Sequence, residues 1–240
     1  MSEPTPAPAF IRNGDGVHVR VGATEAETHA EGALFIAAHG ALVVSDLHLE
    51  KGSSFALRGQ LIPPYDTRAT LKRLAALIER LKPDIVVSLG DSFHDIGGPA
   101  RMAPMDRKEL KRLVGKADWV WIEGNHDPEI PGALGGRTMR ELRLGELTLR
   151  HEPREGAARG EIAGHLHPCA RVSSRGRSVR ARCFAADGER LVMPAFGAYA
   201  GGLNVRDVAF APIFPAGAAA VLMGRGKLYP VAGARLIADA

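Results

Sequence analysis

The chain has 240 residues, of which 45% are hydrophobic and 24% are charged. This composition excludes a disordered or fibrous protein, and the length is sufficient for one domain with a sizeable core. The 31 Lys and Arg residues outnumber the 27 Asp and Glu residues and give a net charge of +4. That small excess is mildly favourable for an anionic partner but does not by itself indicate nucleic-acid binding.

The amino-terminal segment lacks the basic start and the apolar stretch of a targeting peptide. We therefore expect residues 1–9 to form a flexible N-terminus and residues 10–240 to form a single domain. Apolar runs fall short of the ~20 residues that a membrane span requires, so we expect a soluble protein with no membrane partner. Two cysteines, Cys169 and Cys183, are too few for a disulfide framework and favour a cytoplasmic location.

Apolar and amphipathic segments alternate in the first half of the chain. The apolar segments predict strands over residues 34–38, 41–45, 85–89 and 119–122. His39 and Gly40 lie between the first two and predict a hairpin turn. One amphipathic segment predicts a helix that begins at Asp66 or Thr67, either suitable as the N-cap, and ends before Pro83. A second helix is predicted over residues 106–114. This order indicates an α/β core with parallel strands whose following loops meet at one edge.

The remainder of the chain is typical of β-structure. Apolar segments at residues 147–150 and 161–163 predict strands. Asp187 and Gly188 lie between two further apolar segments and are a strong hairpin signal. The sequence ends with a second predicted hairpin, over residues 218–223 and 227–231. There is no internal repeat and no sign of a second-domain boundary.

Five polar clusters follow predicted strands in chain order. They are Asp46-Leu47-His48, Gly90-Asp91, Gly124-Asn125-His126-Asp127, His151 and Gly164-His165-Leu166-His167. If the loops after neighbouring strands meet, these clusters converge. With His126 and Asp127 left over, they offer two Asp, one Asn and four His, which is the number of ligands needed to hold two divalent cations side by side.

This ligand set suits the hydrolysis of a phosphodiester. Two divalent metals ~3.5–4 Å apart activate a water molecule, neutralise the phosphoryl oxygens and clamp the phosphate. Asp91 can bridge both ions, while the neutral amide of Asn125 limits the negative charge of the site. Mixed imidazole and carboxylate ligands suit Mn, Fe or Zn better than Ca, and we expect Mn first. His126 adjoins Asn125 and is expected to face the substrate.

The ordered motifs resemble those of the calcineurin-like metallophosphoesterase superfamily, namely D-x-H, G-D, G-N-H-[DE], H and G-H-x-H. The resemblance implies an α/β fold in which two sheets form a sandwich flanked by helices (α-β-β-α). It assigns one metal ion to Asp46, His48 and His167, the other to Asn125, His151 and His165, and the bridging position to Asp91. It also implies that His126 stabilises the transition state or protonates the leaving group, with Asp127 orienting it.

A narrower resemblance rests on residues 45–52, 63–68, 90–95 and 194–204, which look like those of bacterial ligase-associated DNA-damage-response endonucleases. It implies a metal-dependent endonuclease that works with DNA-repair partners such as a DNA ligase or helicase. One alternative is a phosphodiesterase or phosphomonoesterase acting on small molecules or cyclic nucleotides. Another is a non-catalytic repair adaptor, against which the complete ligand set argues.

Some residues outside the ligand set admit two interpretations. His94 is either a donor to a ligand carboxylate or a partly buried structural residue. Arg58 either contacts a phosphate or faces solvent. The same choice, phosphate contact or solvated strand and loop, applies to a basic segment with Arg171, Arg175, Arg177, Arg180 and Arg182. Three glycines, Gly197, Gly201 and Gly202, either allow close backbone packing near the site or are ordinary loop residues.

Overall fold

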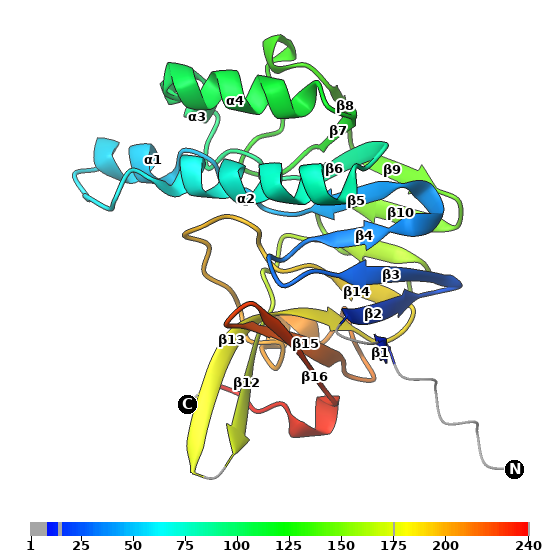
Figure 1. Ribbon diagram of the computed structural model, residues 1–240. Coiled ribbons are helices and arrows are strands. Elements are labelled where there is room, and N and C mark those ends of the chain that lie inside the picture. Colours follow the sequence, from blue (N-terminus) through cyan, green and yellow to red (C-terminus); the bar gives the residue numbers. More distant parts are fainter. Residues whose placement is uncertain (1–8, 14–15, 175, 240) are drawn as a thin grey trace, which may run out of the picture.

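The computed structural model describes residues 9–13, 16–174 and 176–239 and contains two packed sheets (Figure 1). The strands of the first sheet lie in chain order: β1 (Phe10–Asn13), β2 (Gly16–Val21), β3 (Thr24–Thr28), β4 (Leu34–Ile36), β5 (Ala41–Val44), β6 (Ile85–Leu89), β7 (Asp118–Ile122) and β8 (Arg137–Met139). Neighbours are antiparallel from β1 to β5 and parallel from β5 to β8. The predicted parallel core is therefore confirmed.

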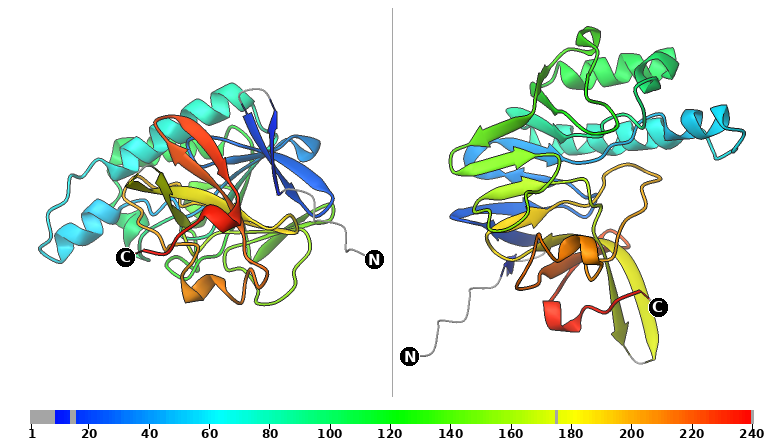
Figure 2. Two further views of the ribbon diagram at one scale, coloured as in Figure 1. Left: turned by 90° about the horizontal axis from the view of Figure 1, so that it is seen from below. Right: turned by 180° about the vertical axis from the view of Figure 1, so that it is seen from behind.

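The second sheet has the spatial order β16-β15-β13-β14-β11-β10-β9, and β12 pairs with β13. Its strands are β9 (Glu141–Leu144), β10 (Leu147–Arg150), β11 (Glu161–Ala163), β12 (Cys169–Ser174), β13 (Arg177–Ala186), β14 (Arg190–Val192), β15 (Ala219–Gly224) and β16 (Lys227–Val231). Both predicted hairpins, β13–β14 and β15–β16, are confirmed. The ribbons show the paired β12 and β13 extending away from the sheets (Figures 1 and 2).

The α-helices of the described residues lie on the side of the first sheet that faces away from the second sheet (Figure 1). They are α1 (Lys51–Leu57), α2 (Asp66–Leu81), α3 (Gly98–Arg101) and α4 (Pro104–Val114). Leu74 of α2 and Leu110 of α4 belong to one buried apolar cluster with Trp119 and Trp121 of β7. Burial of these large side chains holds the helical layer on the sheet, since each contributes roughly 1.5–3 kcal/mol or more when removed from water.

The two predicted helices are confirmed, although their first turns differ in detail from the prediction. Asp66 is the first residue of α2 rather than its N-cap, and its carboxylate accepts a hydrogen bond from the backbone N–H of Gly52 at 3.1 Å. That contact ties α1 to α2. The second helix begins two residues earlier than predicted, at Pro104, because proline is well suited to the first position of a helix.

The main core lies between the two sheets. It consists of inward-facing side chains from both sheets, including Val19, Leu34, Val43, Val87, Val120, Leu149, Ile162, Phe184 and Val221. A third apolar cluster covers the far face of the second sheet, where Phe210 of the 3-10 helix η3 (Val208–Phe210) packs with Phe214 and Leu236. The expected two-sheet sandwich is confirmed, and in the described residues its second outer layer consists of 3-10 helices and loops.

A buried ion pair lies within the second sheet, and its arginine also binds the loop that follows β10. Glu161 and Arg190 are 3% and 2% exposed, and Oε2 of Glu161 lies 2.6 Å from Nε of Arg190. Arg190 also donates hydrogen bonds to the carbonyl oxygens of Ile213 at 2.5 Å and Gly156 at 3.0 Å. Because buried charges are tolerated only with such partners, we expect this cluster to fix the loop between β10 and β11.

The structure bears on the expectations for the N-terminus, for membrane spans and for the two cysteines. Residues 1–8 of the expected flexible terminus lie outside the described residues, whereas Ala9 is buried and its carbonyl accepts a hydrogen bond from Arg20. In the described part of the chain, every helix is too short or too polar to cross a lipid bilayer. Cys169 and Cys183 are buried free thiols.

Candidate metal centre

The predicted ligands lie just after the carboxyl ends of strands from both sheets. Asp46 follows β5 and Asp91 follows β6, both in the first sheet, while Asn125 lies three residues beyond β7. His151 follows β10 and His165 follows β11, both in the second sheet. The strand-end loops of the two sheets therefore supply the centre jointly.

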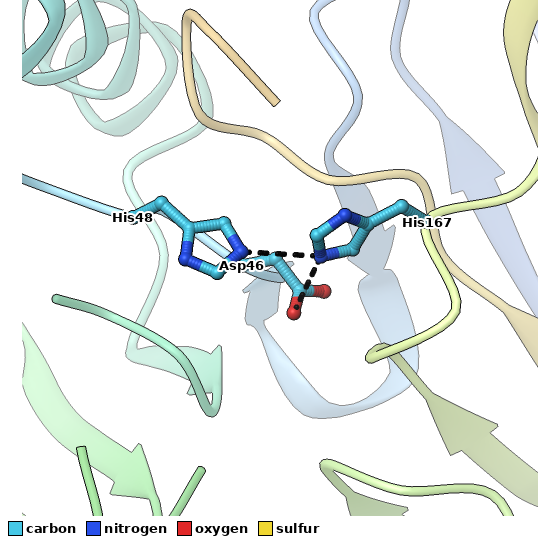
Figure 3. A group of neighbouring side chains, drawn as sticks. All are labelled: Asp46, His48 and His167. Carbon is cyan, nitrogen blue, oxygen red and sulfur yellow. Dashed lines mark hydrogen bonds and ion pairs between the residues drawn. The ribbon is translucent and has the colours of Figure 1, made fainter. Parts of the chain in front are cut away.

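The first ligand group consists of Asp46, His48 and His167, whose side chains point toward one another (Figure 3). One ligand atom from each residue lies within 4.8 Å of the other two. Nε2 of His167 is 3.2 Å from Nε2 of His48 and 3.1 Å from Oδ1 of Asp46. Three potential donor atoms thus lie close together, and one of them belongs to the fully buried carboxylate of Asp46.

The second group consists of Asp91, His151 and His165, again with ligand atoms within 4.8 Å of one another. Nε2 of His151 lies 3.1 Å from Nδ1 of His165 and 3.5 Å from Oδ2 of Asp91. The amide oxygen of Asn125 is 2.9 Å from the same His151 atom. On the other side of the His151 ring, Nδ1 is 2.9 Å from the carbonyl oxygen of Leu89. A proton on Nδ1 would leave Nε2 free to bind a cation.

The electrostatics of this cluster favour a positive charge. Burial lowers the pKa of His151, but the carboxylates of Asp91 and Asp46 outweigh burial and raise it to about 9. An environment that favours the protonated imidazole also attracts a cation. The imidazole nitrogens and carboxylate oxygens are ligands that Mn, Fe and Zn accept. The residues present therefore fit a pair of such ions.

Backbone strain is concentrated at the same side chains. The φ angles of Asp46, His48, Asp91, His165 and His167 are 52°, 42°, 44°, 67° and 45°, all in the left-handed region. A non-glycine residue there costs roughly 1–2 kcal/mol, and such residues cluster at functional sites because the surrounding structure must hold them. The strain supports a functional interpretation of the cluster.

Glycines allow the strands to approach closely at the centre. A Cβ atom on Gly90 would overlap the ring of His151, and one on Gly164 would lie 2.6 Å from Oδ2 of Asp46. A Cβ on Gly124 would overlap the backbone nitrogen of Asp91. Only glycine fits these three positions without moving a predicted ligand.

His126 lies on the open side of the second group. Its ring is 42% exposed, and its Nε2 atom is 3.9 Å from Oδ2 of Asp91. Its backbone N–H donates to Oδ1 of Asp91 at 2.9 Å, and its Nδ1 atom is 2.9 Å from the carbonyl oxygen of His94. The backbone contact holds the bridging candidate Asp91, while the exposed Nε2 atom can meet a substrate.

The orienting role expected of Asp127 must be corrected. Oδ2 of Asp127 accepts a hydrogen bond from the backbone N–H of Phe93 at 2.8 Å, and burial raises the pKa of this carboxyl group to about 7. The contact at Nδ1 of His126 comes instead from the His94 carbonyl. Asp127 therefore fixes the loop after β6, and the backbone of that loop orients His126.

His94 contributes its ring as well as its carbonyl group. The ring stacks on that of His126 with centroids 5.6 Å apart, and it meets the ring of His48 edge-on at the same distance. Its Nδ1 atom is buried without a hydrogen-bond partner among the described residues, which does not support the proposed donor role toward a ligand carboxylate. Arg58 follows α1 and is exposed.

The basic segment is divided between internal and exposed positions. Arg180 and Arg182 share one face of β13, as their alternation predicted, and both donate to carbonyl oxygens of the loop at residues 194–204. Arg171 donates to Oγ of Ser178 on the exposed hairpin, and Arg177 is exposed. Arg175 lies outside the described residues. Arg182 is thus better explained by internal contacts than by phosphate binding.

A family model and two solved structures are similar to the chain, and the family model and the first of these structures agree with this architecture. The family model for calcineurin-like phosphoesterases matches residues 41–180. The crystal structure of Pseudomonas putida nuclease MPE is similar over 90% of this chain and 100% of that chain, with 24% identity and a TM-score of 0.69. The E. coli phosphoesterase YfcE is similar over 83% and 97% of the two chains, with 15% identity and a TM-score of 0.39.

No curated protein gives a significant match to the chain. The family match begins at the first residue of β5 and extends into β13, so it includes all seven predicted ligands. The chain belongs to the calcineurin-like phosphoesterase family and is a metal-dependent hydrolase.

Proposed function

We propose that the protein is a manganese-dependent phosphodiesterase that cleaves DNA as a repair-associated endonuclease. The observation that carries this proposal is the meeting of the four segments on which the narrower resemblance rests. The backbone N–H of His94 donates to the carbonyl of Leu49 at 2.9 Å, and Nζ of Lys51 donates to the carbonyl of Tyr199 at 3.1 Å. The Gly52 to Asp66 bond connects the remaining segment. These hydrogen bonds join the four segments, two of which carry the predicted ligands Asp46, His48 and Asp91.

The side chains have separable roles in this proposal. Two bound ions would supply an activated water and neutralise the phosphate. Asp46, His48 and His167 would hold one ion, and Asn125, His151 and His165 would hold the other. Asp91 would be shared by both ions. His126 approaches from the exposed side and either stabilises the transition state or donates a proton to the departing alcohol, while the ring of His94 supports it by stacking.

We extend the proposal to a cytoplasmic partnership with a DNA ligase or helicase, as the narrower resemblance implies. Purified protein passed over an immobilised ligase or helicase from the same organism is expected to be retained. A control protein of equal charge is passed over the same column. If both proteins are retained to the same extent, the result counts against that partnership and leaves the catalytic proposal intact.

A matched panel of substrates tests the proposed activity. Protein loaded with Mn²⁺ is incubated with supercoiled plasmid, a single-stranded oligonucleotide, a cyclic nucleotide, an aryl phosphodiester and an aryl phosphomonoester. We expect cleavage of DNA and of the aryl diester, with little action on the monoester. Turnover of the cyclic nucleotide or the monoester with DNA left intact would support the small-molecule alternative. Two bound metals with no turnover of any substrate would support the adaptor alternative.

Replacing His126 with Gln should lower kcat by roughly 10²–10⁴-fold, the usual range for loss of a positioned proton donor. Metal content should not change, because the hydrogen bond to Asp91 comes from the backbone N–H and is retained. The measurement is kcat on two diesters, one with a nitrophenolate and one with an alkoxide leaving group.

A proton donor matters most for the alkoxide, which leaves poorly without a proton. A larger loss for that substrate therefore assigns His126 to proton donation, and equal losses assign it to charge stabilisation. Unchanged kcat on both diesters would remove His126 from the mechanism. His39, a half-buried residue outside the five polar clusters, provides the matched control as His39→Gln.

A further inference from the structure

A short loop after β14 lies directly on the backbone that carries Asp46. We call residues 194–198 the strap. The backbone N–H of Phe196 donates to the carbonyl of Ser45 at 2.7 Å, and that of Gly197 donates to the carbonyl of Asp46 at 3.1 Å. A Cβ atom on Gly197 would lie 2.5 Å from the carbonyl oxygen of Leu47. The strap therefore touches both peptide groups that flank this predicted metal ligand.

Two arginines from different elements hold the strap on its other side. Nη1 of Arg182, in β13, donates to the carbonyls of Ala195 at 2.9 Å and Gly197 at 3.3 Å. Nη2 of Arg73, in α2, donates to the carbonyl of Phe196 at 2.5 Å, and its guanidinium group lies over the Phe196 ring at 4.9 Å. Three successive carbonyl groups are thus bound by guanidinium donors.

The strap contacts a residue whose backbone conformation is strained. Asp46 has a φ of 52°, and a left-handed conformation persists only where neighbouring contacts hold it. The hydrogen bond from Gly197 to the Asp46 carbonyl is one such contact, and the position of the strap depends on the arginines. If the strap moves, the Asp46 backbone can relax and carry its carboxylate away from His48 and His167.

In the second ligand group, the backbone N–H of His165 donates to Oδ2 of Asp46 at 3.1 Å, but Asp91 and His151 are held by contacts that involve neither Asp46 nor the strap. Oδ1 of Asp91 is bound by the backbone of His126, and Nδ1 of His151 lies at the carbonyl of Leu89. These contacts come from the loops after β6 and β7 and from β6 itself, all outside residues 194–198. Loosening the strap should therefore affect one metal site more than the other.

We propose that Arg73 and Arg182 are positioning residues for the metal site of Asp46, His48 and His167, and that they act through the strap. Neither arginine lies in the five polar clusters. Both donate to carbonyl oxygens of the strap rather than to a predicted metal-ligand atom. The inference rests on the metal centre but not on DNA as the substrate, so a metal-binding measurement tests it independently of the nuclease proposal.

The test is calorimetric titration of Mn²⁺ into metal-free protein without substrate. The variant Arg182→Met keeps an unbranched stem but loses both hydrogen bonds. It should weaken one of the two binding steps by about 10–100-fold, the usual effect of removing a partner that orients a ligand. The weakened step should be the one that disappears in His48→Ala. Turnover of an aryl phosphodiester should recover at saturating Mn²⁺, so the apparent metal requirement changes more than kcat.

Gly197→Ala displaces the strap without altering an arginine and should weaken the same binding step, which keeps the test decisive if Arg182→Met folds poorly. Gly201→Ala, where a Cβ meets open space, and Arg171→Met on the exposed hairpin are matched controls that should bind both ions normally. If Arg182→Met and Gly197→Ala both bind two Mn²⁺ ions with the affinities of the wild-type protein, the proposal is overturned. Equal weakening of both binding steps would also overturn it.

Discussion

Replacing Asp91 with Asn is expected to lower phosphodiester turnover by more than about 100-fold while the fold is retained. Residues that only orient a metal ligand contribute 10–100-fold, and loss of the charge between two cations should exceed that. Asn is nearly isosteric, and its amide oxygen can still accept the hydrogen bond from the His126 backbone. The missing quantity is therefore charge rather than shape.

Turnover of an aryl phosphodiester at saturating Mn²⁺ measures the effect, and thermal unfolding reports the fold. Asp118→Asn is a suitable control, since Asp118 is exposed and forms a surface ion pair with Arg137. Wild-type turnover by Asp91→Asn in metal-supplemented assays would remove Asp91 from its bridging position and, with it, the proposed arrangement of the two ions.

The largest expected effect on stability is at the buried pair of Glu161 and Arg190. Glu161→Gln removes one charge and leaves a buried guanidinium group without its counter-ion, and breaking such a pair costs about 3–5 kcal/mol. Arg190→Met should cost at least as much, because the carbonyls of Ile213 and Gly156 also lose their donor. Urea unfolding gives the free energy of unfolding for each variant.

The surface pair of Asp118 and Arg137 gives the contrasting case. Its side chains are 49% and 48% exposed and 2.8 Å apart, so Asp118→Asn should cost less than about 1 kcal/mol. If Glu161→Gln and Asp118→Asn lower the free energy of unfolding by the same amount, burial does not determine how much an ion pair contributes to stability. In that case Arg190 does not fix the loop after His151.

The sequence predicted the elements whose hydrophobic pattern is strong and continuous. Strands β6, β10 and β11 begin and end at the predicted residues, because each is a short apolar run bounded by polar loops. The first three strands were not predicted. In β2, Val17, Val19 and Val21 alternate with His18 and Arg20, which is the pattern of a half-buried strand, so this signal was present and was overlooked.

Helix α1 was also missed, for a different reason. Its sequence contains Gly52, Ser53 and Ser54, which are poor helix formers. The helix is held by tertiary contacts, such as the bond between the Gly52 N–H and Asp66. Such a contact joins residues that only the folded chain brings together, so local propensity cannot reveal it.

At the candidate metal centre the sequence indicated which side chains could bind metal ions, and the structure brings them together. They stood out in the sequence because carboxylates and imidazoles follow strands at motif spacing. The orienting role of Asp127 was implied by the family resemblance, whereas in the structure its carboxylate accepts a hydrogen bond from the Phe93 N–H. Arg73 and Arg182 gave no signal as supporting residues, since they bind main-chain carbonyls, which every residue possesses.

Each group of predicted metal ligands contains residues from both sheets, so neither group can assemble before both sheets have been synthesised. A nascent chain that has emerged only as far as β8 carries Asp46, His48, Asp91 and Asn125 but lacks three of the four ligand histidines. Neither ion can be fully coordinated until the chain beyond residue 167 has left the ribosome and the second sheet has folded against the first. Hydrolytic activity is thereby postponed until the segments that carry His151, His165 and His167 have folded against the first sheet.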